Sequence, residues 1–490
     1  MLARLADEVG RIDKEAPFTV ALMYPSPYGA GMSSLGFQRI YRALQEEPGL
    51  ACERIFLDDE AETDLTKQTR PISYEHLRPL DHFPVIATSV AYEIEIGGLI
   101  AMLDAANIPA RRDERDDRHP FVLAGGPLTF SNPLPLAGLV DAIVIGEAEE
   151  IVIPVFKLLE SMQGSKRADV LFALAKIPHV FVPAIHGDVL PEVAKCDHSL
   201  LPAWAPIRTP HAALSDMFLI ETERGCSRTC TYCVMRRSTN GGMRLVPMER
   251  ILELVPEGAR RVGLVGAAVS DHPRIVQIVD TLADRGMEVG LSSLRPDRLS
   301  DEFVGALKRA GYKTLTTAMD GPSDRLRGTL ERRAKEKHLQ RSAEMARKHH
   351  MERMKLYLMV GLPTETDADI DECVTFVTEL SKIVPISLGI APFCAKRNTP
   401  LDGQPFAGIQ VVHDRLERLR RGFKGRVDVR STSAKWAWVE YVLAQGGAAE
   451  GLAVIDAVRA GGRFADWRRA FASREATPAK RRRSLAIAPI

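Results

Sequence analysis

Short apolar runs alternate with helical patterns in two separate series along this chain of 490 residues. The first series opens with the run FTVALMY, a turn rich in Pro, Gly and Ser, and a helical pattern with Phe37, Ile40 and Leu44 on one face. Continuous apolar strands that alternate with helices are typical of a parallel sheet covered on both faces. We therefore predict an α/β fold whose first domain, residues 1–163, is Rossmann-like and doubly wound.

The second series occupies residues 216–405 and consists of six strand–helix units. Six units are too few for the closed eightfold barrel, so the pattern predicts an open, partial (βα)6 barrel with functional loops at the carboxyl ends of its strands. The six apolar runs are MFLIE, RRVGLV, MEVGL, YKTLTTAM, MKLYLMV and ISLGIAP.

Three further segments complete the expected organisation. Residues 164–215 mix Pro, His and charged residues, which indicates a connecting segment between two domains. Residues 406–475 carry helical patterns and are expected to form a helical C-terminal region that caps the barrel. The basic end, residues 476–490, has the composition of a disordered tail.

The charge balance limits the partners that the chain is expected to bind. Lys and Arg number 65 against 64 Asp and Glu, so the net charge of +1 gives no general attraction to nucleic acid or to an anionic membrane. The first 18 residues contain no uninterrupted apolar stretch, and we expect neither a secretory signal nor a membrane partner but a cytoplasmic protein with a small-molecule substrate. Nucleic acid is not excluded, because residues 326–355 are rich in Arg and Lys, although outer helices of a barrel also explain those charges.

Three of the seven cysteines, Cys226, Cys230 and Cys233, lie within eight positions in the segment ETERGCSRTCTYC. Thiolates at this spacing can converge from one loop on a single metal centre. An iron–sulfur cluster normally takes four protein ligands, so three cysteines leave one iron with an open position, as in catalytic metal sites. A structural zinc site would need a fourth ligand close by, and no second CxxC or HxxxH accompanies the three.

This CxxxCxxC spacing, with Tyr232 directly before the last cysteine, resembles the signature of the radical S-adenosylmethionine (SAM) superfamily. The resemblance implies a [4Fe–4S] cluster held by Cys226, Cys230 and Cys233, whose open iron the amino and carboxylate groups of SAM chelate. One electron from a reductant such as ferredoxin or flavodoxin then breaks the S–C5′ bond and yields a 5′-deoxyadenosyl radical. Tyr232 is expected near the adenine.

The resemblance also implies SAM contacts at the carboxyl ends of the later strands. Most members place a carboxylate in the turn after the second strand; it is absent from LVGAAVSDHP, where Ser270 or Asp271 would replace it. Asp320 stands where many relatives have Glu. Arg295 is equally explained as a surface or helix-start arginine, and Gly361 as a structural turn before a Thr-x-x-Asp helix start. The cofactor-binding set that we predict is Tyr232, Gly266, Ala267, Ala268, Ser270, Ser292, Arg295, Asp320, Ser323 and Gly361; no catalytic acid or base is assigned.

The first domain resembles the cobalamin-binding domain that precedes the barrel in one radical SAM branch. The resemblance rests on the AGGP turn (residues 124–127) and the IGEAEE helix start (residues 145–150), whereas the glycines at 29, 31 and 36 have the wrong spacing for a dinucleotide site. Typical cobalamin domains carry Asp-x-His-x-x-Gly after the first strand, and PSPYGAGMSSLG contains no histidine. If cobalamin binds, we expect it between the Tyr24–Ser34 loop, the Ser89–Tyr92 loop, Gly125 and Gly126, and Gly146 and Glu147.

Three functions therefore remain open. The first is a cobalamin-dependent radical methyltransferase, in which both domains face one cavity. The second is a radical SAM enzyme without cobalamin that modifies RNA or protein, its first domain serving substrate shaping or partner binding. The third is a non-catalytic iron–sulfur or zinc protein, which would need a fourth ligand from Cys196, Cys373 or Cys394, each of which is expected to be an ordinary buried thiol.

Overall fold

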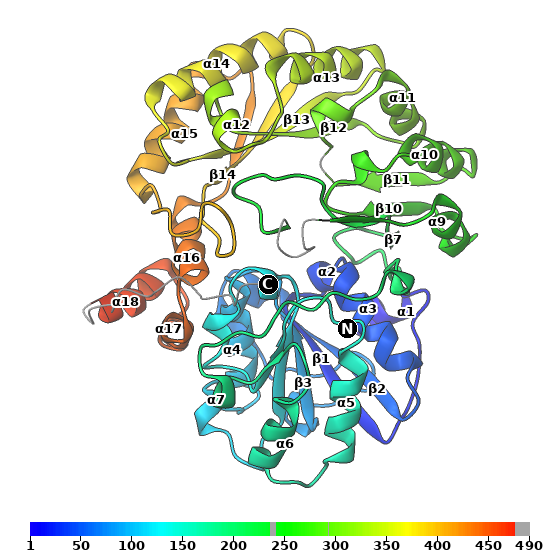
Figure 1. The fold of residues 1–490 in the computed structure, drawn as a ribbon, viewed down its shortest axis with the longest axis vertical. Helices are drawn as coiled ribbons and strands as arrows, with labels where there is room; N and C mark the ends of the chain where they lie inside the picture. Colours follow the sequence, from blue (N-terminus) through cyan, green and yellow to red (C-terminus); the bar gives the residue numbers. More distant parts are fainter. Residues whose placement is uncertain (236–241, 293, 476–490) are drawn as a thin grey trace.

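The computed structural model describes residues 1–235, 242–292 and 294–475; the predicted tail, residues 476–490, lies outside the described residues. The chain forms two lobes, an N-terminal α/β domain and a partial barrel, with the C-terminal helices beside both (Figure 1). None of the helices in the described part is long and apolar enough to cross a membrane.

The N-terminal lobe is built on a six-stranded sheet with the order β2-β1-β3-β4-β5-β6. Strands β1 to β5 are parallel and β6 is antiparallel to β5. In this doubly wound order the strand sequence reverses between β1 and β3, which confirms the predicted Rossmann-like domain. The strands are β1 (Phe18–Pro27), β2 (Leu50–Leu57), β3 (Val85–Ser89), β4 (Phe121–Gly125), β5 (Ala142–Val144) and β6 (Val180–Phe181).

Helices cover both faces of this sheet because successive side chains of a strand point to opposite faces. On β1, Val20 and Leu22 belong to the core under α3 and α5, whereas Ala21 and Met23 belong to the core under α4. The side chain of Ser34 caps α3 by accepting a hydrogen bond from Phe37 N at 3.4 Å. The helices of this lobe are α1 (Leu2–Ala6), α2 (Tyr28–Gly31), α3 (Leu35–Glu46), α4 (Glu95–Ala105), α5 (Val152–Ser161), α6 (Arg167–Leu174) and α7 (Pro183–His186).

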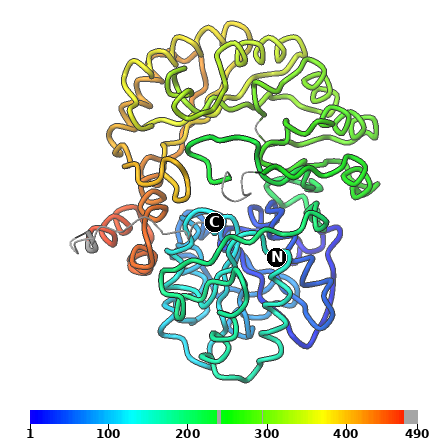
Figure 2. Tube along the Cα trace, viewed as in Figure 1, coloured from blue at the N-terminus to red at the C-terminus, as the bar shows by residue number. Residues whose placement is uncertain are grey.

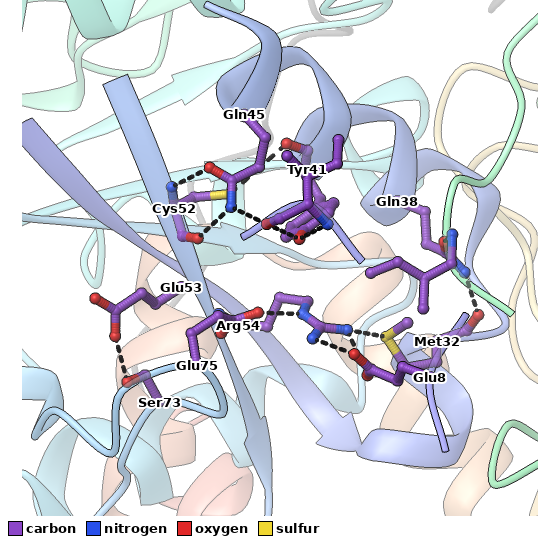
Figure 3. Close-up of polar contacts among 12 residues, drawn as sticks. Glu8, Met32, Gln38, Tyr41, Gln45, Cys52, Glu53, Arg54, Ser73 and Glu75 are labelled. Carbon is purple, nitrogen blue, oxygen red and sulfur yellow. Dashed lines mark hydrogen bonds and ion pairs between the residues drawn. The ribbon is translucent and has the colours of Figure 1, made fainter. Parts of the chain in front are cut away.

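A buried ion triad ties the first residues of the chain to strand β2. The guanidinium of Arg54, which is fully buried, donates to Glu8 at 2.8 Å and to Glu75 at 2.6 Å (Figure 3). The hydroxyl of Tyr28 donates to the same Glu8 carboxylate at 2.7 Å. Because Tyr28 lies in the loop after β1, the triad also fixes that loop at the carboxyl end of the sheet.

The barrel lobe contains two parallel sheets of order β11-β10-β7 and β12-β13-β14-β15. A parallel bridge between Leu294 and Thr317 joins them into one open barrel wall. The predicted six strands are present, and a seventh, β15, extends the wall from within the region expected to be helical. The strands are β7 (Met217–Glu221), β10 (Arg261–Val265), β11 (Glu288–Leu291), β12 (Thr314–Asp320), β13 (Arg353–Val360), β14 (Ile386–Pro392) and β15 (Asp428–Ser431).

Helices line the outer surface of the barrel wall, and their starts follow the sequence signals. The predicted Thr-x-x-Asp start is a capping box, in which Thr366 N donates to Asp369 at 2.8 Å. The hydroxyl of Ser300 caps the helix after β11 by accepting a hydrogen bond from Phe303 N at 3.1 Å. The helices of this lobe are α9 (Met248–Leu254), α10 (Ile275–Asp284), α11 (Asp301–Arg309), α12 (Asp324–Thr329), α13 (Glu336–Lys348), α14 (Asp367–Ser381) and α15 (Ile409–Phe423).

The C-terminal helices α16 (Ala434–Gln445), α17 (Ala448–Arg459) and α18 (Phe464–Glu475) return to the N-terminal lobe (Figure 2). Helix α16 contacts β14 and α15, whereas α17 and α18 complete the apolar core under α4 with residues such as Val454 and Trp467. The amide of Asn132 donates to three carbonyls at the end of α16, of Leu443, Ala444 and Gly446, at 2.9 to 3.2 Å. These helices therefore join the two lobes, rather than capping the barrel alone as the sequence suggested.

Candidate active site

The three cysteines follow the first barrel strand and lie between two short strands that pair with each other. After β7, strand β8 (Glu223–Gly225) pairs antiparallel with β9 (Met243–Leu245). Gly225 then adopts φ +98°, a conformation that favours glycine, and turns the chain into Cys226. Burial raises the pKa of Cys233 to about 11. Electrostatic interaction with the nearby thiols of Cys230 and Cys226 acts on this pKa in the same direction. The structure thus brings the three predicted ligands together.

The spacing of these sulfur atoms bears on the kind of metal group that they can hold. A tetrahedral zinc ion with Zn–S bonds of about 2.3 Å would place its sulfur ligands roughly 4 Å apart. Among the described residues, the three sulfur atoms do not form a group within 4.8 Å of one another. Three thiols in one loop are the ligand type that iron–sulfur clusters take.

The turn after β10 holds the predicted residues Gly266, Ala267 and Ala268, and a carboxylate from the cysteine segment fills it. Ala268 N donates to Glu223 Oε1 at 2.6 Å, and Ala267 N–H also bonds this carboxylate. A Cβ on Gly266 would lie 2.2 Å from Glu223 Oε1, so the absence of a side chain at Gly266 lets the Glu223 carboxylate occupy this position. Burial raises the pKa of Glu223 to about 7, and its Oε2 has no hydrogen-bond partner in the structure. Sequence reasoning missed Glu223, although it lies three residues before Cys226.

Ser270, Ser292 and Arg295 lie around the same turn, at the ends of β10 and β11. Ser270 is buried in the 3-10 turn Val269–Asp271, and its hydroxyl accepts a weak hydrogen bond of 3.4 Å from Arg295 N. Ser292 donates to Gly266 O at 3.3 Å. Two of the predicted residues therefore bind neighbouring backbone groups across the strand ends.

The predicted Arg295 belongs to a buried charge network that touches the cysteine loop. Its guanidinium forms ion pairs with Asp271 and Asp297. From the loop, Arg228 donates to Asp297 at 2.8 Å and Ser227 donates to Asp271 at 3.0 Å. Asp271, proposed from sequence as a substitute carboxylate, is thus held by arginine and serine. The network ties the cysteine loop to the ends of β10 and β11.

Tyr232 and Asp320 lie together beneath the cysteine loop. Asp320 ends β12 with φ +63°, where the register with β13 shifts, and its carboxylate accepts a hydrogen bond from Tyr232. A left-handed non-glycine residue at a strand end is strained, and such strain concentrates at functional sites. Asp320 also forms an ion pair with Arg332. Arg332 is therefore a second residue of this region that sequence reasoning missed.

Ser323 and Gly361 lie further out, where both take part in local structure. The hydroxyl of Ser323 donates to Asp369 at 2.6 Å and accepts from Leu326 N at 3.2 Å, so it caps α12. Gly361 has φ +77°, and its N–H donates to Glu365 at 2.9 Å. Both interactions account for these residues without a ligand.

A cavity of about 420 Å³ lies at the carboxyl edge of the N-terminal sheet. Its floor is apolar, with Leu22, Leu123 and Phe156 among its lining residues. A Cβ at Gly36 or Gly125 would meet no atom within 4 Å, so these glycines leave open space at the rim. Of the loops predicted to hold cobalamin, the lining residues are Ser34, Ser89, Gly125, Gly126, Gly146 and Glu147; Tyr24 and Tyr92 are not among the described residues that line it.

The barrel supplies the far wall of this cavity through Glu221, Arg224, Met235 and Val265. Arg224, two residues before Cys226, forms ion pairs with Glu149 at 2.7 Å and Glu147 at 3.4 Å. Both glutamates belong to the predicted IGEAEE helix start of the first domain. The cavity therefore lies between the functional edges of the two lobes.

Two of the three cysteines proposed as a fourth ligand, Cys196 and Cys373, are held elsewhere. Cys373 is fully buried in α14, and burial raises the pKa of its thiol to about 12. Cys196 lies near Glu147 and Glu149, but Arg224 and Arg244 already pair with these carboxylates. Two guanidinium groups at the donor atoms make this cluster an ion-pair network between the lobes rather than a metal site.

Two family models match the chain. The model described as radical SAM proteins, N-terminal, matches residues 36–183, and the model of the radical SAM superfamily matches residues 220–377. The second match contains the cysteine loop and the strands from β10 to β13.

Curated proteins and solved structures also resemble this chain. An uncharacterized protein of Methanocaldococcus jannaschii is 26% identical over 400 residues, which cover 79% of this chain and 80% of that protein. The tRNA-2-methylthio-N(6)-dimethylallyladenosine synthase of Aquifex aeolicus is 25% identical over 43% of this chain, and the match spans 50% of its own length.

The structure of the cobalamin-dependent SAM radical enzyme OxsB with aqua-cobalamin and SAM bound aligns with 84% of this chain at a TM-score of 0.50 and 12% identity. The alignment spans 58% of that longer chain, and at this identity it shows the shared fold of both lobes. The chain thus belongs to the radical SAM superfamily, and its barrel follows an N-terminal domain that matches the model of radical SAM proteins, N-terminal.

Proposed function

We propose that this chain is a cobalamin-dependent radical SAM enzyme that methylates an unactivated carbon of a small molecule. The observation that carries the proposal is the cavity between the lobes. Its apolar floor and glycine rim come from the N-terminal sheet, and its far wall contains Arg224, two residues before Cys226. A cofactor in this cavity faces the cysteine loop, as a reaction that combines two cofactors requires.

In this proposal Cys226, Cys230 and Cys233 hold a [4Fe–4S] cluster with one iron open to SAM. When bound and reduced by a ferredoxin or flavodoxin, the cluster and SAM supply a 5′-deoxyadenosyl radical. The chain holds the loop through Arg228 and Asp297, and through the Thr231 hydrogen bond to the carbonyl of Leu330 at 3.2 Å. These contacts keep the geometry of the three thiols fixed.

Cobalamin, when bound, supplies the methyl group. Gly36 and Gly125, where a Cβ would meet no atom, would let it approach the backbone, while the apolar floor would receive an apolar part of the cofactor. Because residues 24–36 contain no histidine, we expect bound cobalamin to have no histidine ligand from this loop. An absorption or EPR spectrum of the bound cobalamin would report that coordination.

The test uses protein purified anaerobically with cobalamin and reconstituted with iron and sulfide. We expect one bound cobalamin, about four iron atoms, and 5′-deoxyadenosine on reduction with SAM. Gly36→Phe would fill the cavity without meeting a neighbouring atom at Cβ and should lower cobalamin retention at least tenfold, while SAM cleavage continues. Gly258→Phe, at an exposed glycine outside the cavity, is the matched control.

The outcomes of this test distinguish between the alternative functions that the sequence left open. Protein that carries the cluster but yields no 5′-deoxyadenosine would contradict the enzymatic proposal. Protein that cleaves SAM but never retains cobalamin would favour the cobalamin-independent alternative acting on RNA or protein. The Aquifex aeolicus relative is named for a tRNA modification, and another relative, from Geotalea uraniireducens, is named as a ribosomal protein uS12 methylthiotransferase; these names give that alternative its substrate classes.

A further inference from the structure

The turn after α12 is bound directly to the cysteine loop. Thr231 N donates to Leu330 O at 3.2 Å, and the Thr231 hydroxyl donates to Thr329 O at 3.4 Å. Leu326 and Leu330 form a small apolar cluster against which Tyr232 packs. The turn therefore moves with the cysteine loop as one unit.

Two left-handed residues flank Arg332 in this turn, Glu331 with φ +52° and Arg333 with φ +60°. Neither is glycine, so each adopts a strained backbone conformation. The N–H of Arg332 is also fixed, because it donates to Arg327 O at 3.0 Å. The turn is therefore strained on both sides of Arg332, and its backbone fixes the direction in which the Arg332 side chain leaves the chain.

The side chain of Arg332 is directed at a cluster ligand. Its guanidinium forms an ion pair with Asp320, and its positive charge also acts on the thiol of Cys230. Arg332 and Asp320 are both largely buried, with side-chain exposures of 11% and 13%. Asp320 in turn accepts a hydrogen bond from Tyr232. A strained strand end and a strained turn therefore place one guanidinium between a carboxylate and Cys230.

A positive charge beside a ligating sulfur stabilises the reduced form of the cluster, which carries one more negative charge, and the charge around a cluster is one determinant of its potential. Burial increases this effect because little water screens the guanidinium. Asp320 opposes it by compensating the positive charge of Arg332.

We propose that Arg332 is a positioning residue that raises the reduction potential of the cluster through Cys230, and that Asp320 limits this rise. The inference rests on the proposed function, since it requires that Cys230 ligate a cluster. It concerns how readily the cluster accepts its electron, a property separate from cobalamin binding and from the substrate.

The experiment is an EPR-monitored redox titration of the full chain, loaded anaerobically with its cluster and studied without SAM. At the wild-type midpoint, Arg332→Gln should lower the ratio of reduced to oxidised cluster about tenfold, which equals a potential lower by about 59 mV for a one-electron couple. Arg332→Lys keeps a charge and a donor and should give a smaller change. Asp320→Asn should move the ratio in the opposite direction, because the guanidinium loses its counter-charge.

Arg333→Gln is the matched control, since it removes the same charge from an exposed neighbour. A charge at the surface is screened by salt and should leave the ratio unchanged. If Arg332→Gln shifts the ratio no more than Arg333→Gln, or if Asp320→Asn shifts it in the same direction as Arg332→Gln, the proposal is wrong.

If Arg332→Gln fails to retain iron, the Arg332→Lys and Asp320→Asn variants test the proposal instead. Loaded Arg332→Lys and Asp320→Asn proteins with the wild-type potential would refute the role of Arg332, and shifts in the directions stated would support it. A wild-type protein that takes up no four-iron cluster would instead refute the proposed function, so the two failures are distinguishable by iron content.

Discussion

Replacing Glu223 by glutamine should stabilise the cluster-free protein at pH 8 and not at pH 5. The carboxylate is buried and shares its surroundings with the acidic side chains of Glu221 and Asp271, so burial first and these charges second raise its pKa from 4.5 to about 7. Between pH 4.5 and about pH 7, Glu223 stays protonated in the folded state but has already lost its proton in the unfolded state. Stability contributed by the protonated form is therefore present below pH 4.5 and is lost as pH rises through 7.

The size of the effect follows from the same values. A rise from 4.5 to about 7 corresponds to about 3 kcal/mol of destabilisation once the group is ionised, as an upper limit. Glutamine removes that penalty and keeps an acceptor for Ala268 N, but it places an amide donor where Oε2 has no partner, at a cost of about 1 kcal/mol. The expected net gain is about 1 to 2 kcal/mol at pH 8, with a small loss at pH 5.

Differential scanning calorimetry of cluster-free protein under reducing conditions measures this difference. For a chain of this size the gain should raise Tm by on the order of 2 °C at pH 8. Glu257→Gln, at an exposed position of the same lobe, is the control and should show no such pH dependence. A Glu223→Gln variant whose Tm difference from wild type is the same at pH 5 and pH 8 would show that Glu223 does not titrate in this range.

Two further predictions concern the metal ligands and the first lobe. Cys230→Ala should abolish both iron binding and SAM cleavage, measured as iron content and 5′-deoxyadenosine; a variant that keeps either would contradict the ligand assignment. Arg54→Ala leaves Glu8 and Glu75 buried without a cation and should cost about 3 to 5 kcal/mol of stability, measured by calorimetry. An unchanged Tm in that variant would mean that water reaches the two carboxylates.

The parts of the fold that sequence predicts are those set by local pattern. Continuous apolar runs identify the buried parallel strands of both lobes, and a Thr-x-x-Asp spacing locates the start of α14. Strand β15 was missed because DVRS is short, polar and only partly buried, and nothing in it distinguishes a strand from a loop. The sequence shows that α17 and α18 have apolar faces. It does not show which part of the protein those faces pack against.

The site residues likewise fall into those that local sequence predicts and those that only the fold reveals. The spacing of Cys226, Cys230 and Cys233 is local, so the sequence alone predicts that one loop carries all three. Glu223 reaches a turn 45 residues away, and only the fold shows that its carboxylate fills that turn. Arg332 is likewise distant in sequence from Cys230, within a charged stretch that resembles an ordinary outer helix.

The two lobes are joined in a way that suits a site shared between them. Domains within one chain move relative to each other unless their interface is large and apolar. Here α17 and α18 complete the core of the first lobe while α16 contacts the barrel, and Arg224 and Arg244 pair with Glu147 across the cavity wall. Apolar packing on one side and buried ion pairs on another restrain both rotation and separation. Groups on the two facing edges are therefore held at a fixed separation, which is the geometric requirement for a reaction that uses both.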